Sequence, residues 1–286
     1  MRISTPSRLA LRLIALVYLA VLLAFPIVTI LWRTFQPGLG AFWASIQTPA
    51  AISALNLSLL IVAIVVPLNV IFGVVTALAL VRGRFPGRRL LSGIVDLPFA
   101  VSPIVVGVAL IMLWGVNGWF GGLDSLGFRV IFGLPGMVIA TLFVTLPFVV
   151  REVEPVLREI GTEQEQAAAT LGASSWQTFV RITLPAIRWG LTYGVVLTAA
   201  RALGEFGAVI MVSSGFPGVS QTLTLLVHSR YIDDHNTYGA YAAATLLMMI
   251  ALVILLAMTL IDRLRPDHHS PSSTSSTTSA PARSTS

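Results

Sequence analysis

Arg201 and Glu205 are two charged residues inside an otherwise apolar stretch of this chain, in the run RALGEFGAV. An ionised side chain at the centre of a bilayer costs about 2.5–3.5 kcal/mol, so we expect such charges to be paired. A spacing of four residues places both on one face of a helix, where each can neutralise the other. Gly204 and Gly207 would let a neighbouring helix approach closely.

This pair has two interpretations. In the first, it is a buried ion pair that only locks the packing of helices. In the second, its face lies on a translocation path, where Arg201 holds an oxyanion through two parallel hydrogen bonds. Glu205 would then prevent Arg201 from trapping that anion permanently. The sequence leaves both interpretations open.

The other candidate residues are better explained by structural or solvated roles than by chemistry. Asp96 is more typical of a helix-packing or pre-proline hydrogen-bonding group than of a substrate contact. The run HSRYIDDHNTY contains four possible metal ligands, namely His228, Asp233, Asp234 and His235. They suggest a metal cluster of an intramembrane enzyme, but a solvated outer loop explains this run better. His268 and His269 lie in a Ser/Thr/Pro-rich tail, where we expect solvated side chains.

The polar stretch from Thr162 to Pro185 reads TEQEQAAATLGASSWQTFVRITLP. Thr162 and Glu165 have the spacing of a capping box, which predicts a helix beginning at Glu163. Gly172 suits the left-handed position that ends a helix. A second capping-box spacing, at Ser174 and Gln177, predicts another helix with an apolar face, ending at Leu184-Pro185.

The elements that must position these residues are membrane helices. Hydrophobic residues make up 56% of the chain, charged residues 10%, and the mean hydropathy is +0.87. Soluble domains carry about 25% charged residues, so lipid must cover much of this surface. The chain has no cysteine, which excludes disulfides and thiolate chemistry. The net charge of +6 does not indicate nucleic acid, because the arginines are scattered between apolar spans.

A helix needs about 20 apolar residues to cross a bilayer. The hydropathy pattern predicts an all-α membrane protein with six spans: Leu13–Trp32, Leu57–Val81, Leu90–Trp114, Leu134–Val150, Trp189–Ser213 and Tyr238–Ile261. The third contains Asp96, Pro98 and Pro103, which predict a kink buried in protein. The first span resembles a signal peptide in its basic flank, but its length favours a retained helix.

Arginine counts predict the orientation. Fourteen arginines lie in one set of connections and three in the other. The positive-inside rule therefore places both termini and the 162–185 loop in the cytoplasm. Residues 262–286 should form a disordered cytoplasmic tail.

The 162–185 loop resembles the cytoplasmic signature of binding-protein-dependent ABC transporter permeases. That signature reads E-A-A, three residues, G, nine residues, then I-x-L-P; the positions in register here are Ala167, Ala168, Gly172, Ile182, Leu184 and Pro185. Its Glu position is Gln166, a departure that could weaken or shift one contact.

The resemblance implies a type I (MetI-like) importer permease domain over residues 54–261. Residues 1–53 would add a cytoplasmic stub, one helix and an outer loop. It also implies that the loop docks on a cytoplasmic ABC ATPase dimer through Gln166, Ala167, Ala168 and Gly172. Ile182, Leu184 and Pro185 would anchor the loop's second helix to the bundle.

The chain would be a non-catalytic subunit of the bacterial cytoplasmic membrane. It contains no G-x-x-x-x-G-K-[ST] nucleotide loop, so the partner ATPase would bind ATP and Mg²⁺ and this chain no cofactor.

RALGEFGAV, VSSGFPG, SQTLTLLV and LPFAVSPIVVGVAL resemble the sulfate and molybdate branch of these permeases, and within it the W-type subunits of sulfate/thiosulfate permeases. This resemblance implies a T-type subunit as the second half of a heterodimer and an extracytoplasmic sulfate-binding protein. Molybdate, and less typically polyamine or iron, remain alternative cargoes. An ion-coupled carrier without an ATPase is a further alternative, although no symmetric pair of ion sites is visible.

Overall fold

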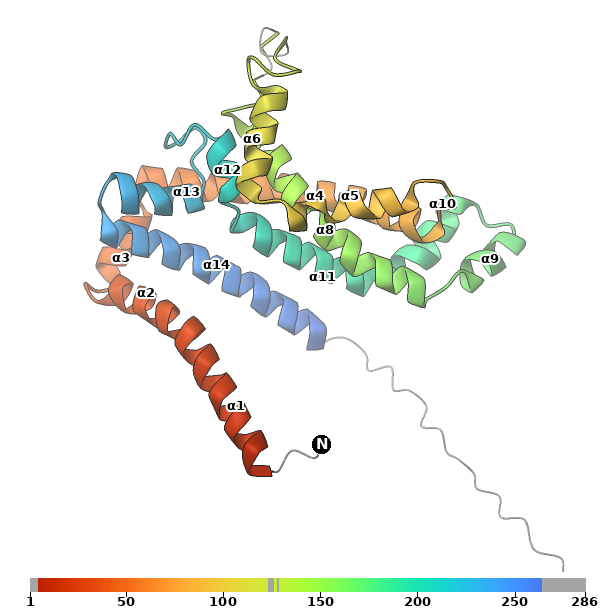
Figure 1. Ribbon diagram of the computed structural model, residues 1–286, viewed down its shortest axis with the longest axis horizontal. Coiled ribbons are helices and arrows are strands. Elements are labelled where there is room, and N and C mark those ends of the chain that lie inside the picture. The colour runs from red at the N-terminus through yellow and green to blue at the C-terminus, as the bar shows by residue number, and fades with distance from the viewer. Residues whose placement is uncertain (1–4, 123–125, 128, 264–286) are drawn as a thin grey trace, which may run out of the picture.

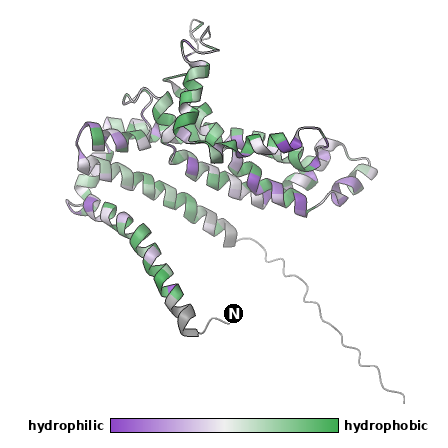
Figure 2. Cartoon of the chain, viewed as in Figure 1, coloured by the Kyte–Doolittle hydropathy of each residue, from purple (hydrophilic) through white to green (hydrophobic). Residues whose placement is uncertain are grey.

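The computed structural model describes residues 5–122, 126, 127 and 129–263, and within these ranges the chain folds into helices without strands. The all-α membrane prediction is confirmed: four of these helices are long and apolar enough to cross a bilayer, and a bent pair can supply a fifth span. Figure 2 shows hydrophobic residues along the long helices and hydrophilic ones gathering around α9 (Glu163–Thr170). The tail predicted over residues 262–286 falls almost wholly outside the described residues.

The six predicted spans correspond to the following elements (Figure 1). The first is α1 (Thr5–Leu19), the π-helical turn η1 (Ala20–Ala24) and α2 (Phe25–Phe35); the second is α4 (Pro49–Arg82); the third is α5 (Arg88–Ala100) with α6 (Pro103–Trp114); the fourth is α8 (Leu134–Glu159); the fifth is α11 (Leu184–Leu203) with α12 (Gly207–Val212); and the sixth is α14 (Thr237–Arg263). The short α3 (Leu39–Ile46), α13 (Leu223–His228) and η3 (Ser229–Asp233) lie between spans.

Helices α4, α8 and α11 pack together as the centre of the bundle. Glycines allow this close approach: a Cβ on Gly73 would lie 2.6 Å from Val149 Cγ1, and one on Gly194 would lie 2.9 Å from Val149 Cα. The two larger apolar clusters of the interior lie toward α6 and α12 and toward α5. Side chains of residues 11–28 are exposed, so the first span depends on its apolar surroundings rather than on this core.

The third span is bent more sharply than the predicted kink: the helix axis turns through 112° between α5 and α6. Val101 is extended between them and Pro103 opens α6. Proline disfavours a helical conformation of the preceding residue, which ends α5 before Ser102.

The fifth span was predicted as one helix, and this prediction is wrong. Helix α11 ends at Leu203, and α12 starts at Gly207 on a different course (Figure 1). Gly204 and Gly207 are poor helix formers, and Glu205 offers the backbone a side-chain acceptor that a continuous helix would not use.

A buried arginine joins the turns that connect the spans at the end of the bundle opposite α9. Arg230 donates to Thr48 Oγ1 at 2.8 Å and to the Gly239 carbonyl at 3.0 Å. Burial lowers the pKa of Arg230 below its ordinary value, and the Asp234 carboxylate opposes that shift. Arg230 therefore ties the start of α4 to the start of α14.

Candidate functional site

The Arg201–Glu205 pair lies across the break between α11 and α12. Arg201 Nη1 is 2.6 Å from Glu205 Oε2, but it is not aligned as a hydrogen bond, so the contact is mainly electrostatic. Glu205 Oε1 accepts a hydrogen bond from the Ala208 amide at 2.8 Å. The carboxylate therefore both pairs with Arg201 and occupies the N-terminus of α12, where negative charge is stabilised.

Burial of the two partners is unequal. The Glu205 side chain is 1% exposed, whereas that of Arg201 is 34% exposed. Arg201 lines a cavity of about 440 Å³ at the bend between α5 and α6, together with Val144 and Phe148 of α8 and the bend residues Pro98, Phe99, Ala100, Val101, Ser102 and Pro103. Arg201 is therefore paired with Glu205 while its side chain stays partly exposed, and the residue lines the cavity.

The two glycines beside this pair have different surroundings. A Cβ on Gly207 would lie 3.0 Å from Pro103 Cβ, so α12 closely approaches the start of α6, as predicted. Around Gly204 no atom of a neighbouring helix would come within 4 Å of a Cβ, so the predicted close approach there is wrong. Gly204 instead lines an apolar cavity of about 610 Å³ bordered by α11, α13 and α14.

The 162–185 loop forms two short helices joined at Gly172, namely α9 (Glu163–Thr170) and α10 (Ser175–Thr178). Gly172 has φ +84°, and the Ala173 amide donates to the Ala168 carbonyl, as in a left-handed helix end. The capping box of Ser174 and Gln177 is confirmed.

The capping box at Thr162 and Glu165 is wrong. Gln166 Nε2 donates to Thr162 Oγ1 at 3.0 Å, and no side chain caps the first amides of α9. Glu165 does not bond the Thr162 amide because its carboxylate forms an ion pair with Arg82, which lies outside this helix.

Pro185 does not end the second helix. Helix α10 runs into the π-helical turn η2 (Phe179–Thr183) and then into α11 without a break. The Leu184 amide donates to the Phe179 carbonyl, five residues back, and Pro185 lies in the first turn of α11. Proline has no amide hydrogen to donate to the preceding turn, and the chain accommodates this directly after the π-helical turn η2.

The tip of this loop is exposed. Gln166, Ala167 and Gly172 face solvent, and Ala168 is half-buried. Two large apolar side chains are also exposed there, Leu171 at 89% and Trp176 at 71%. In the anchoring segment, Leu184 packs against the apolar cluster between α4 and α8, whereas Ile182 is half-buried and Pro185 is exposed.

An ion pair that the sequence did not indicate holds α9 to the bundle. Arg82, the last residue of α4, donates through Nε to Glu165 Oε2 at 3.0 Å. Arg82 also donates to the Leu157 and Gly161 carbonyls, and Thr183 Oγ1 donates to Glu165 Oε1 at 2.9 Å. The partners are 83 residues apart, so no local pattern could have paired them.

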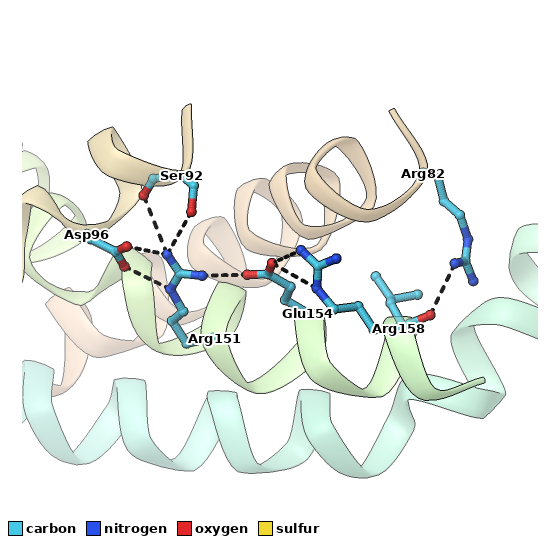
Figure 3. Close-up of polar contacts among 7 residues, drawn as sticks. Arg82, Ser92, Asp96, Arg151, Glu154 and Arg158 are labelled. Carbon is cyan, nitrogen blue, oxygen red and sulfur yellow. Dashed lines mark hydrogen bonds and ion pairs between the residues drawn. The ribbon is translucent and has the colours of Figure 1, made fainter. Parts of the chain in front are cut away.

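A second polar network, also missed, connects α8 to α5 (Figure 3). Arg151 donates to Asp96 Oδ1 at 2.8 Å, to Ser92 Oγ at 3.0 Å and to Glu154 Oε2 at 2.6 Å. Glu154 also accepts from Arg158 one turn further along α8. Asp96 therefore packs α5 on α8, as its first interpretation predicted. The available signal was the charge of Asp96 inside an apolar span, which required a cation.

The outer run has no metal-site geometry. Among the described residues no group of three His, Asp or Glu side chains is placed to hold a metal ion. The ring of His228 instead lies 5.3 Å from that of Phe206, measured between centroids.

Comparisons with known proteins identify related chains. The family model described as "Binding-protein-dependent transport system inner membrane component" matches residues 69–267. The sulfate transport system permease protein CysW of Synechocystis sp. is 46% identical over 257 residues, covering 90% of this chain and 92% of that protein. CysW of Escherichia coli K12 is 45% identical over 238 residues, covering 82% and 81%.

A probable sulfate transport system permease protein cysT of Mesostigma viride is 38% identical over 252 residues, covering 88% of this chain and 93% of that protein. Among solved structures, a chain of a bacterial ABC transporter that imports alginate superposes with a TM-score of 0.71 at 19% identity, covering 90% of this chain and 95% of that chain. That likeness supports the fold.

Proposed function

Because this chain belongs to the family of binding-protein-dependent transport system inner membrane components, we propose that it is a permease subunit of an ATP-driven importer of sulfate or thiosulfate. As a member of this family it is a non-catalytic, multi-pass membrane subunit. The observation that carries the anion assignment is that Arg201 lines the α5–α6 cavity while it forms an ion pair with buried Glu205. The similarity to CysW proteins, which agrees with the predicted W-type resemblance, supports sulfate over molybdate.

Arg201 would bind a tetrahedral dianion through two parallel N–H donors of its planar fork. Glu205 lowers the net positive charge of the cavity, so the anion is bound weakly enough to leave. Binding that is favourable but transient is what conduction along a path requires. Ser102 at the bend would add a hydroxyl donor beside the arginine.

The energy would come from a cytoplasmic ABC ATPase dimer, which binds the ATP and Mg²⁺. The exposed loop tip would dock on it through Gln166, Ala167, Ala168 and Gly172, with both termini on the same side of the membrane. A related T-type permease subunit would supply the other half of the path, and an extracytoplasmic binding protein would deliver the anion. Closure of the ATPase dimer would draw the two docking loops together and open the bundle outward; hydrolysis would let it open inward.

The docking assignment is tested by placing bulk at the loop turn. Gly172→Trp introduces a side chain at φ +84°, and Gly87→Trp introduces the same bulk at φ +98° in the α4–α5 turn. Neither glycine has an atom near its missing Cβ, and both variants carry the backbone strain of a side chain at positive φ, so the Gly87→Trp variant controls for that strain. We expect the ATPase to copurify with the Gly87→Trp variant and to be lost from the Gly172→Trp variant. A Gly172→Trp complex that keeps its ATPase and its ATP-driven uptake would contradict the docking assignment.

The cargo is tested by uptake of labelled sulfate into cells or vesicles holding the whole complex. Thiosulfate should compete and an equal concentration of molybdate should not; the reverse result would reassign the cargo. Collapse of the proton gradient at constant ATP should leave uptake unchanged, whereas an ion-coupled carrier would stop.

A further inference from the structure

Helix α9 is attached to the bundle by polar contacts rather than by a core. None of its residues is buried, and its exposed face carries Gln166 and Ala167. Its inward-facing Glu165 is half-buried between Arg82 of α4 and Thr183 of η2. An isolated two-turn helix is unstable in water, so its position depends on such contacts.

Arg82 joins several elements at one point. Its guanidinium bonds both oxygens of Glu165, at 3.0 and 3.2 Å, and the carbonyls of Leu157 and Gly161 at the end of α8. A cation at a helix C-terminus satisfies carbonyls that have no partner within the helix. Arg82 therefore fixes the ends of α4 and α8 to each other and both of them to α9.

The contacts continue from that point toward the cavity. Arg158, next to Leu157 on α8, bonds Glu154; Glu154 bonds Arg151, and Arg151 bonds Asp96 of α5 (Figure 3). Helix α5 leads directly into the bend that lines the Arg201 cavity. A rigid element with defined contacts at both ends is a physical route by which displacement can pass between sites.

We propose that Glu165, beside the signature position Gln166, is the positioning residue that transmits movement of the docked loop to α4 and α8. This inference rests on the proposed function, since it requires a docked ATPase. Glu165 would contribute little to docking itself, because its carboxylate points into the bundle and away from the exposed loop tip. Without the Glu165 carboxylate, α9 would still move with the ATPase, but α4 and α8 would not move with α9.

The test compares Glu165→Gln with Glu163→Gln in the complete complex reconstituted into vesicles. Both changes remove one negative charge from the first turn of α9, but Glu163 is exposed and forms no ion pair among the described residues. We expect Glu165→Gln to retain the ATPase and its ATP hydrolysis but to take up roughly tenfold less sulfate per ATP, a difference of about 1.4 kcal/mol. Glu163→Gln should behave like the unmodified protein.

A second readout does not depend on the cargo. The chain has no cysteine, so Gln164→Cys and Phe85→Cys provide unique sites for spin labels on α9 and beyond the end of α4. With Glu165 present, the distance distribution between the labels should stay narrow when ATP is added. With Glu165→Gln it should broaden or shift, and Arg82→Lys, which keeps the charge but loses the fork, should act in the same direction.

Normal uptake by Glu165→Gln, or release of the ATPase in step with the loss of uptake, would overturn the proposal and leave the proposed function intact. Failure of both Glu165→Gln and Arg82→Lys to assemble would assign the pair a purely structural role and also overturn it. A complex of unmodified chains that does not take up sulfate would instead contradict the proposed function.

Discussion

The Arg201–Glu205 and Arg82–Glu165 pairs each consist of an arginine and a glutamate, but they differ in sequence separation and in the burial of the glutamate. In the first, four residues separate the partners and the glutamate is 1% exposed. In the second, 83 residues separate them and the side chains are 20% and 21% exposed. The Arg201–Glu205 pair is the inner pair, and its glutamate has no water that could replace Arg201. The Arg82–Glu165 pair is the outer pair; its interaction energy is small, but it joins several elements. We therefore expect the Arg201–Glu205 pair to contribute more to stability, and the proposals above assign anion binding to that pair and the coupling of movements to the Arg82–Glu165 pair.

The largest expected effect comes from removing the buried charge. Glu205→Gln keeps an oxygen for the Ala208 amide but leaves Arg201 without its counter-ion. Arg201 stays 34% exposed, so the expected loss is about 2 kcal/mol, between the values for exposed and for fully buried pairs. Thermal unfolding in detergent should show this loss, and Glu163→Gln should leave the midpoint unchanged. Equal midpoints for the two variants would mean that the inner pair is dispensable.

The next effect separates charge from geometry at the cavity. Arg201→Lys keeps the positive charge beside Glu205 but cannot present two parallel donors. We expect the maximal rate of sulfate uptake to fall about tenfold, which corresponds to one lost charge-assisted hydrogen bond. The amount of assembled complex should not change. Unaltered uptake would favour the packing interpretation of the pair.

A double-mutant cycle measures the outer pair. We expect Arg82→Gln and Glu165→Gln to show a coupling energy of about 1 kcal/mol, as half-exposed pairs do. Arg82→Gln alone should be the more damaging single change, because the Leu157 and Gly161 carbonyls also lose their donor. Denaturation of the four variants supplies the numbers, and additive effects would mean that the contact contributes nothing.

The smallest effect concerns salt. Raising the ionic strength from 0.1 to 1 M shortens the screening length from about 10 to about 3 Å. The coupling of Arg82 with Glu165 should weaken by a few tenths of a kcal/mol, because water and ions reach it. A cycle on Arg201 and Glu205 should lose less of its coupling, because the Glu205 side chain is only 1% exposed although Arg201 lines the cavity. Equal salt sensitivity of the two pairs would contradict the difference in burial.

Local features of the site were predictable and long-range ones were not. The turn at Gly172 and the cap at Ser174 depend on residues within a few positions of each other, so their spacing indicated them. The cap at Thr162 failed because Glu165 has a stronger partner on α4 than the local amides. The same competition explains the break after Leu203, where Glu205 takes the Ala208 amide out of a continuous helix.

The amino-acid sequence by itself determined that this chain is a bundle of membrane helices with a glycine-hinged polar loop. Apolar runs of about 20 residues have no other stable environment than lipid, and a left-handed turn needs glycine. Only the tertiary structure decided how sharp the bend between α5 and α6 is, the place of Arg201 beside the cavity and the pairing of Arg82 with Glu165. These depend on which helices pack together, and packing of α4, α8 and α11 is set by contacts between residues far apart in the chain.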